Sequence, residues 1–424
     1  MNTRLFNARI CSMARGMDIV YGELWVFDEK IAYVGEGMPP RMPFDREIDL
    51  NGNLVLPGFK NAHAHSAMTF LRSFADDLPL LDWLDQKIFP MEARLVPEHA
   101  YMLSLLAIME YLTSGITAAF DMYMFPREMA RATIDSGFRT VLCGTVNNNS
   151  YKNSEELVEW YQYYNTMHER LSCRLGFHAE YTCARDVLEG VAQAVRCLKA
   201  PVFCHNSESR REVEQCVART GMTPTTYMDR FGLFEYGGGG YHCVCLDDRD
   251  TDIFSKRGLA VISCPGSNSK LASGIAPIKT FVDAGIPVAI GTDGPASNNA
   301  LDMFREMFLL TALQKLDTGD ASALPAGDVL KMACVTGARV MGLTECDSLA
   351  AGKYADLIVI DLMQPNMQPL NNIMDNLVYS GGKSVVKMTM VNGRILYEDG
   401  RFDIGVDPTA VYAAANRVIR DMNI

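Results

Sequence analysis

The sequence predicts an α/β fold: a distorted (β/α)8 TIM barrel with a small β-sandwich domain built from both chain ends. Short apolar strand candidates alternate with helical patterns in the middle of the chain, whereas both ends are rich in strands separated by turns. Such alternation is typical of parallel barrels. We expect residues 57–345 to form the barrel, residues 1–56 to begin the β-sandwich domain, and residues 346–424 to complete it and add a terminal helix.

The chain ends carry the strand patterns of the smaller domain. Apolar stretches separated by turn residues lie near the N-terminus at residues 4–11, 22–35 and 46–57. Residues 355–362 and 385–402 repeat this pattern near the C-terminus, and Asn392-Gly393 is a strong hairpin signal. We therefore expect the two ends to pair with each other.

Eight barrel strands are expected from short apolar runs. They lie at residues 54–59, 117–123, 140–145, 174–181, 201–206, 240–245, 259–264 and 287–293. Helical patterns separate most of them, for example at residues 98–115 and 154–171. Four glycines at residues 237–240 are expected to form a flexible lead into the sixth strand.

Composition excludes several classes of function. A net charge of −12 over 424 residues makes nucleic acid or an anionic membrane a poor partner. No stretch approaches the roughly 18 apolar residues of a membrane span, and the first residues lack the apolar core of a signal peptide. The twelve cysteines lie mostly in apolar stretches, so we expect reduced thiols in a cytoplasmic protein.

Histidines gather where the barrel strands are expected to end. His63 and His65 follow the first apolar run, and their i, i+2 spacing in an extended chain points both rings to one face. Catalytic residues of such barrels come from the carboxyl ends of several strands. Five of the seven histidines and two carboxylates occupy such places: His63, His65, His178, His205, His242, Glu208 and Asp293.

This cluster predicts a metal-dependent hydrolytic site. A single histidine at a strand end is more often an ordinary core residue, but convergence of so many makes that reading improbable. Imidazole and carboxylate ligands without thiolate suit Zn, Fe or Mn. Three histidines and one aspartate would leave room for a water, whose pKa on such an ion falls to roughly 7.

At these residues the chain resembles the amidohydrolase superfamily. More narrowly, it resembles the branch of this superfamily whose members are mononuclear deaminases acting on 5′-methylthioadenosine, S-adenosylhomocysteine and related adenosine derivatives. Related chlorohydrolases and guanine- or pterin-type deaminases share much of the pattern. The matching stretches are residues 56–84, 88–95, 177–183, 205–208, 241–246, 267–278, 291–307 and 351–362.

The resemblance implies a role for each site residue. His63, His65, His205 and Asp293 match the ligands of one divalent ion, zinc first, with iron or manganese as alternatives. Glu208 matches the proton shuttle, His242 the residue that holds the attacking hydroxide, and His178 a contact to the substrate ring. Trp83 and Glu92 match the stretch that covers the ribose. Residues 267–278 would close the pocket without a catalytic role.

The implied reaction is hydrolytic deamination at ring carbon six of a 6-aminopurine nucleoside of the adenosine, 5′-deoxyadenosine or 5′-methylthioadenosine type. Three positions depart from the family pattern. Gly144 replaces an arginine of homocysteine-accepting relatives, which argues against S-adenosylhomocysteine. Cys264 replaces a frequent histidine. Glu180 replaces a small residue, and it would either select another ring or cationic group or face water at the rim.

Other readings stay open. The same site would suit a deaminase of a free base of the guanine, 8-oxoguanine or pterin type, or a triazine-type chlorohydrolase or aminohydrolase. A scaffold without activity is disfavoured because the ligand residues are present. We expect a small-molecule substrate, no nucleic-acid or membrane partner, and a homo-oligomer.

Overall fold

A parallel barrel forms the centre of the molecule in this computed structural model, which describes residues 1–36 and 43–423. Each strand pairs in parallel with the next along the chain. The barrel closes where Ala64 bridges to Asp293. Its strands are β6 (Phe59–Ala64), β7 (Ile116–Met122), β8 (Arg139–Cys143), β9 (Leu171–Ala179), β10 (Val202–Asn206), β11 (Gly238–His242), β12 (Leu259–Ser263) and β13 (Val288–Ile290). The predicted eight-stranded barrel is confirmed.

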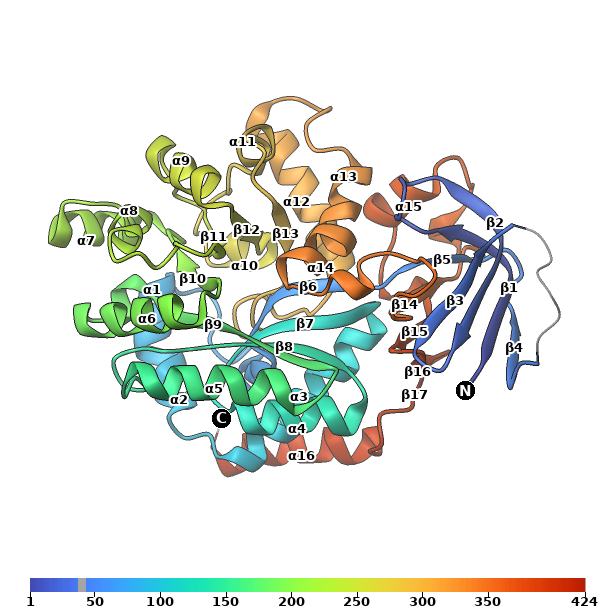
Figure 1. The fold of residues 1–424 in the computed structure, drawn as a ribbon, viewed down its shortest axis with the longest axis horizontal. Coiled ribbons are helices and arrows are strands. Elements are labelled where there is room, and N and C mark those ends of the chain that lie inside the picture. Colours follow the sequence, from blue (N-terminus) through green and yellow to red (C-terminus); the bar gives the residue numbers. More distant parts are fainter. Residues whose placement is uncertain (37–42, 424) are drawn as a thin grey trace.

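The second sheet joins the two ends of the chain, as predicted. Its order is β17-β16-β15-β14-β5-β1-β2-β3, and β4 pairs with β1. In Figure 1 the blue N-terminal strands and red C-terminal strands lie in one sheet beside the barrel. They are β1 (Thr3–Cys11), β2 (Ile19–Phe27), β3 (Lys30–Gly35), β4 (Arg46–Asp49), β5 (Leu54–Pro57), β14 (Leu357–Ile360), β15 (Val386–Val391), β16 (Arg394–Glu398) and β17 (Arg401–Phe402).

Two details of the strand prediction were wrong. The apolar run at residues 54–59 is split: β5 pairs with β1 and β14 in the second sheet, and only Phe59 belongs to the barrel. Gly58 makes the crossing possible, since a Cβ there would lie 2.1 Å from Thr117 Cγ2. Three of the four glycines expected to form a flexible lead, residues 238–240, instead belong to strand β11. A Cβ on Gly238 would lie 1.8 Å from the carbonyl oxygen of Val202.

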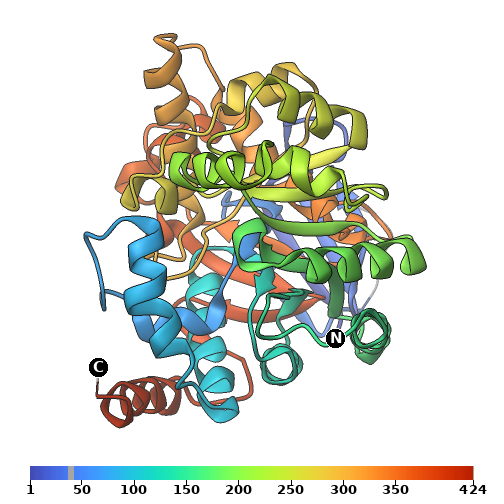
Figure 2. The ribbon, with the colours of Figure 1, turned by 90° about the vertical axis from the view of Figure 1, so that its left-hand side faces the viewer.

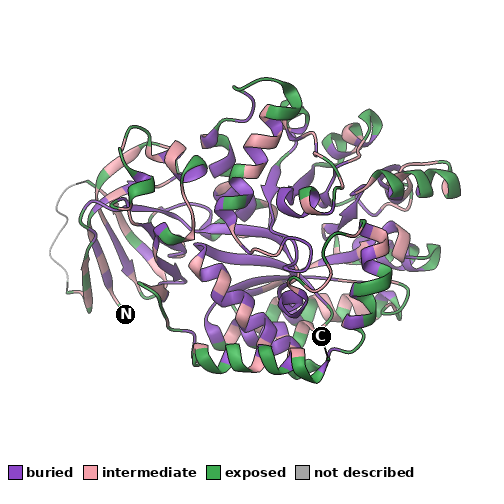
Figure 3. Cartoon of the chain, turned by 180° about the vertical axis from the view of Figure 1, so that it is seen from behind, coloured by how far each residue is buried: buried purple, intermediate pink, exposed green. Residues whose placement is uncertain are grey.

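Helices cover the outside of the barrel. The helices predicted at residues 98–115 and 154–171 are α3 (Pro97–Thr113) and α5 (Ser154–Met167). The others of ten or more residues are α4 (Pro126–Ser136), α6 (Arg185–Leu198), α7 (Arg210–Thr220), α9 (Asp248–Arg257), α12 (Met303–Thr318) and α16 (Pro408–Asp421). Figure 3 shows purple, buried strands inside helices whose outer faces are green.

Shorter helices lie between these elements. They are α1 (Leu80–Trp83), α2 (Phe89–Glu92), α8 (Pro224–Asp229), α10 (Pro265–Lys270), α11 (Ile278–Asp283), α13 (Ala326–Lys331), α14 (Gly337–Val340) and α15 (Ile373–Tyr379). The terminal helix α16 packs on barrel helix α3. In Figure 2 this red helix lies against the cyan part of the chain.

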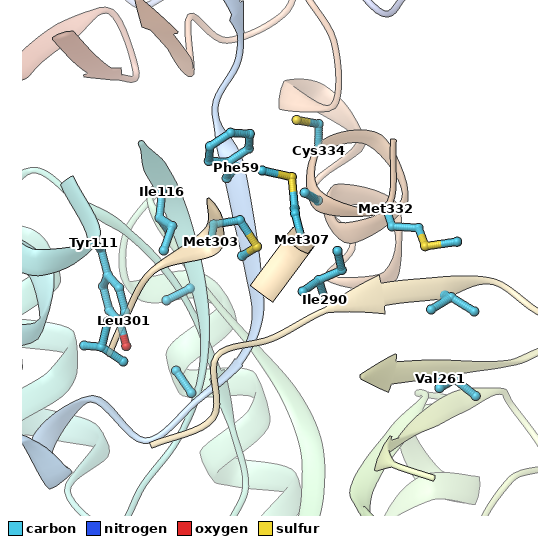
Figure 4. Packing of buried hydrophobic residues seen from close by; sticks show 14 of the residues in the cluster. Phe59, Tyr111, Ile116, Val261, Ile290, Leu301, Met303, Met307, Met332 and Cys334 are labelled. Atoms are coloured by element: carbon cyan, nitrogen blue, oxygen red, sulfur yellow. The ribbon is translucent and has the colours of Figure 1, made fainter. Parts of the chain in front are cut away.

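Apolar packing fixes the barrel wall on which the site depends. Phe59 of β6, Ile290 of β13 and Met307 of α12 are fully buried in one cluster, and Figure 4 shows their side chains converging. The ring of Phe59 meets that of Phe304 edge-on at 5.2 Å. Burial of such side chains contributes about 25 cal/mol per Å² of apolar surface, so the strands that carry the site residues form a rigid frame.

Two further features concern the cysteines and the helices. All twelve cysteines are free thiols, and most are buried. In the part of the chain that the structure describes, no helix combines the length and apolar character needed to cross a bilayer.

Candidate active site

The predicted site residues gather at the carboxyl ends of the barrel strands. One cavity there is lined by His65, Trp83, Glu92, His178, His205, Glu208, His242 and Asp293. His63 lies directly beneath it, fully buried, with its ring 4.7 Å from that of His65 and 4.9 Å from that of His205. The structure thus brings all of them to one end of the barrel.

Histidine and aspartate atoms converge on one point. Nε2 of His63 and Nε2 of His65 lie 3.5 and 3.2 Å from Oδ1 of Asp293. Ligand atoms of these three residues lie within 4.8 Å of one another, and the same holds for His63, His205 and His242. His63 lies in β6 and His65 directly follows it, and their i, i+2 spacing turns both rings to this point, as expected for an extended chain.

The surroundings of the rings fit a divalent ion. Nδ1 of His65 donates to the Met122 carbonyl at 2.5 Å, and Nδ1 of His205 donates to the His178 carbonyl at 2.7 Å. Each bond leaves Nε2 as the metal-binding nitrogen. Neither ring nitrogen of His63 has a hydrogen-bond partner within the described residues. A buried polar atom without a partner is costly, and an ion bound here would supply one.

Burial keeps most of these imidazoles neutral. It lowers the pKa of His63 to about 3, lowers that of His178 to about 4, and holds that of His205 well below its ordinary value. Burial would also lower the pKa of His65, but its hydrogen bond to Asp293 outweighs this and raises that pKa to about 9. Neutral imidazole is the form that binds a metal, and a bound cation would displace the proton on His65.

Asp293 is held as a carboxylate by several donors. Burial would raise its pKa, but the nearby rings of His63 and His65 hold that pKa well below the ordinary value. The hydroxyls of Ser267 and Ser297 donate to Oδ2 at 2.6 and 2.7 Å. The Gly294 N–H donates to Oδ1 at 2.7 Å. The carboxylate is therefore fixed in place, with Oδ1 toward the histidines.

Glu208 and His242 face each other across the cavity. Glu208 is 4% exposed, and burial raises the pKa of its carboxyl. Its Oε2 lies 3.8 Å from Nε2 of His242, whose Nδ1 donates to Oδ1 of Asn268 at 2.8 Å. A carboxyl with a raised pKa is suited to giving and taking a proton near neutral pH.

At this end of the barrel, the backbone adopts an unusual conformation at the ends of three strands. Ser207, His242 and Asp293 all have left-handed backbones, with φ of 50°, 67° and 60°. This region costs a residue other than glycine of order 1–3 kcal/mol, and such strain clusters at functional sites. Here it turns the side chains at the ends of β10, β11 and β13 into the mouth of the barrel.

A separate segment after β6 covers the cavity. Trp83 ends α1 and Glu92 ends α2, and both line the cavity together with Phe89. Trp83 is 4% exposed, and burial raises the pKa of Glu92 to about 6. This segment supplies an aromatic ring and a carboxyl opposite the histidine cluster.

Three residues of the site were missed from the sequence. Ser267 and Asn268 lie in the segment that was expected only to close the pocket, yet they bond to Asp293 and His242. Ser297, in the loop after β13, also bonds to Asp293. The available signal was position, because these residues follow β12 and β13 as the predicted site residues follow other strands.

Two departures from the family pattern, Glu180 and Cys264, are not among the residues that line this cavity. Glu180 neither selects a substrate nor faces water: it is 1% exposed and accepts from Arg219 Nη1 at 3.0 Å and Nη2 at 2.9 Å. Cys264 is fully buried just before α10, and burial holds its thiol pKa well above the ordinary value. The expectation for Glu180 was therefore wrong.

Comparison with known proteins decides the family. The model of the Amidohydrolase family matches residues 54–396. The chain belongs to this family. It is 40% identical over 406 residues to the 5-methylthioadenosine/S-adenosylhomocysteine deaminase of Moorella thermoacetica, covering 93% of this chain and 94% of that protein. The same-named protein of Pelotomaculum thermopropionicum is 38% identical, covering 100% of this chain and 99% of that one.

A solved structure agrees with this assignment. An adenosine deaminase from Xanthomonas campestris with bound zinc is 30% identical, with a TM-score of 0.91 over 100% of this chain and 98% of that one. The amidohydrolase resemblance read from the sequence is confirmed. The chain is a hydrolytic enzyme of this family, with a histidine-containing site for a divalent metal at the mouth of its barrel.

Proposed function

We propose that this amidohydrolase is a metal-dependent deaminase that releases ammonia from 6-aminopurine nucleosides of the adenosine, 5′-deoxyadenosine or 5′-methylthioadenosine type. One observation carries the proposal: the histidine and aspartate cluster, the Glu208 carboxyl and the covering residues Trp83 and Glu92 share one cavity. Relatives named as deaminases of such nucleosides support it over nearly the whole chain.

His63, His65, His205 and Asp293 are the residues that would hold one divalent ion. The neutral rings of His63 and His205 and the ionised Asp293 are in the forms that bind a metal. When bound, such an ion lowers the pKa of water to about 7 and so supplies a hydroxide nucleophile at neutral pH. Zinc is our first choice because the similar adenosine deaminase structure contains it.

The chain's own residues then move the protons. Glu208 takes one proton of the attacking water and delivers it to ring nitrogen one as carbon six is attacked, while His242 orients the attacking oxygen. Asp293 takes the proton that remains on the added oxygen and passes it to the amine, which leaves as ammonia. Its buried carboxyl has a raised pKa, which suits proton transfer near neutral pH. His178 contacts the substrate ring.

The covering segment argues for a neutral nucleoside. Trp83 offers an aromatic face and Glu92 an acceptor for ribose hydroxyls. Among the described residues that line this cavity, none is a lysine or an arginine that would pair with a carboxylate. At Gly144 a Cβ would lie 2.6 Å from the Gly176 carbonyl oxygen. A cationic side chain therefore does not fit there, so we expect little turnover of S-adenosylhomocysteine.

One substitution separates this proposal from a free-base deaminase. Glu92→Ala removes the acceptor for the ribose and leaves the histidine cluster intact. It should lower kcat/KM for adenosine, and kcat/KM for any free base that is turned over should not change. Equal loss on both substrate classes would argue against the ribose contact.

We further propose a homo-oligomer in the cytoplasm. The net charge of −12 argues against nucleic acid as a partner. The twelve free cysteines fit a reducing compartment. Light scattering on the purified enzyme measures the oligomeric state directly, and a mass of one chain would contradict that part of the proposal.

A further inference from the structure

The turn that carries Glu208 depends on a second carboxylate. Strand β10 ends at Asn206, and Ser207 then adopts a left-handed backbone with φ of 50°. The turn leaves three consecutive N–H groups pointing away from the strand ladder, and Glu212 accepts all of them. Its Oε1 accepts from Ser207 at 3.0 Å, and its Oε2 accepts from Glu208 at 2.7 Å and from Ser209 at 3.4 Å.

Only part of this pattern is ordinary helix capping. Ser209 is the N-cap of α7, its hydroxyl accepts from the Glu212 N–H at 3.3 Å, and Glu212 reaches back to the Ser209 N–H. A capping box requires just these two reciprocal bonds. The bonds to Ser207 and Glu208 are additional, and that to Glu208 is the shortest of the set.

Burial of the Glu212 carboxyl in this place costs free energy. Its side chain is 2% exposed, and burial raises its pKa to about 7 against the opposing effect of its backbone hydrogen bonds. The mechanism proposed above gives it no role. Other contacts fix the same turn, since Cys245 N–H donates to the Ser207 carbonyl at 2.9 Å.

We propose that Glu212 is a positioning residue whose carboxylate locks the turn at residues 207–209 and so holds the Glu208 carboxyl where it reaches the reacting ring. This inference rests on the proposed function, in which Glu208 is the proton shuttle. Glu212 itself touches neither the substrate nor the ion; it acts through the backbone of Glu208.

The test is Glu212→Gln. The amide keeps the size of the side chain and one acceptor oxygen, but its NH2 faces an N–H donor of the turn. A misplacement of about 1 Å costs up to about 10²-fold in rate. We therefore expect kcat to fall 10- to 100-fold, with KM within about threefold of the wild-type value and metal content unchanged. Wild-type kcat, or a parallel loss of metal, would overturn the proposal.

Two further variants separate positioning from stability. Ser209→Ala removes the capping hydroxyl but leaves the Glu212 carboxylate on Glu208, so its melting temperature should fall while kcat stays within about threefold. Glu214→Gln makes the same chemical change at an exposed position of α7 and should match the wild type. A Ser209→Ala variant as slow as Glu212→Gln would show that only helix stability matters, and would overturn the proposal.

A crystal structure of Glu212→Gln tests the inference without any assay of activity. The Glu208 main chain and carboxyl should be displaced while His205 stays in place; an unchanged turn would contradict the inference. If Glu212→Gln does not fold, Glu212→Asp keeps the charge but is too short to reach all three N–H groups, and the same kcat loss and displacement are expected of it. If the wild type turns over no nucleoside, the proposed function fails, while the structural result still decides the role of Glu212.

Discussion

Glu208 owes its suitability for proton transfer to its surroundings. The side chain is almost fully buried, burial raises its pKa, and His242 lies 3.8 Å away. Glu208→Gln keeps the shape but cannot release or take up the proton. We expect kcat to fall by about 10²–10⁴-fold, the usual contribution of a general acid–base group.

The control for this variant is its metal content, since Glu208 is not among the proposed ligands. Metal analysis should give the same stoichiometry for Glu208→Gln and the wild type. Glu208→Gln with near-wild-type ammonia release would remove Glu208 from the mechanism.

Glu92 should give the activity a pH dependence on the acid side. Burial raises its pKa to about 6, so the carboxylate is present above that pH and is protonated below it. A hydrogen bond to a charged group contributes about 1.5–3 kcal/mol. We therefore expect kcat/KM for adenosine to fall about 10- to 100-fold as pH drops through 6.

Glu92→Gln fixes this side chain in an uncharged form. Its kcat/KM for adenosine should be low at neutral pH and should lack the step near pH 6. If the variant shows the same step as the wild type, another group is titrating.

Single residues differ in how well the sequence reveals them. His63 and His65 could be found because their spacing and the direction of strand side chains are both local properties. Glu180 could not, because its partner Arg219 lies 39 residues away on a helix. Nothing local distinguishes a carboxylate that pairs with a distant guanidinium from one that faces solvent.

At the level of elements, α10 links the reacting centre to the helices behind it. Its Ser267 and Asn268 bond to Asp293 and His242, and its Gly266 N–H donates to the buried carboxyl of Glu306 on α12 at 2.8 Å. Asn268→Ala should leave Nδ1 of His242 without its acceptor. Partners of this kind are worth roughly 10–100-fold in activity, and steady-state kinetics should show a loss in kcat of that size.

A matched control lies in the same helix. Among the described residues, the Ser269 hydroxyl donates only to the Pro265 carbonyl of its own helix, at 2.7 Å, so Ser269→Ala should retain wild-type kcat. If Asn268→Ala has the same kcat as Ser269→Ala and the wild type, the orientation of His242 does not depend on α10.

At the boundaries of elements, the periodicity of the sequence does not predict which sheet a strand joins. The run at residues 54–59 is buried throughout, and a buried strand looks the same in either sheet. The pairing of β5 with β1 and with β14, some 300 residues later, assigns it to the second sheet. The role of α10 was hidden for a similar reason, since the residues it contacts come from β11 and from the loop after β13.

At the scale of the whole molecule, a buried ion pair joins the barrel to the second sheet. Arg139, which begins β8, donates to Asp356 through Nε at 2.8 Å and Nη2 at 3.1 Å, and to Asn392 Oδ1 at 3.0 Å. Arg139→Met would leave the Asp356 charge buried without its partner. We expect a loss of about 3–5 kcal/mol in the free energy of unfolding, measured by denaturant titration.

The double variant Arg139→Met, Asp356→Leu provides the comparison. Because it removes both charges, it should lose less stability than Arg139→Met alone. Arg139 lies at the amino end of its strand, away from the site, so kcat of the folded single variant should be unchanged. A double variant less stable than the single one would contradict this account of the junction.

The overall architecture could be predicted because it repeats. Eight alternations of strand and helix, flanked by strand-rich ends, leave few arrangements that bury every apolar face. What the repeats could not give was the contacts between distant elements, such as Arg139 with Asp356, because these depend on three-dimensional packing.

The most direct test of the central claim is ammonia release from a substrate panel by the metal-loaded enzyme. The panel is adenosine, 5′-deoxyadenosine, 5′-methylthioadenosine, S-adenosylhomocysteine, adenine, guanine, 8-oxoguanine, isoxanthopterin and a chlorotriazine, with chloride release also measured for the last. Our account predicts turnover of the three neutral 6-aminopurine nucleosides, little of S-adenosylhomocysteine, and none after the metal is removed. Turnover of only a free base or the triazine, or turnover that survives metal removal, would contradict it.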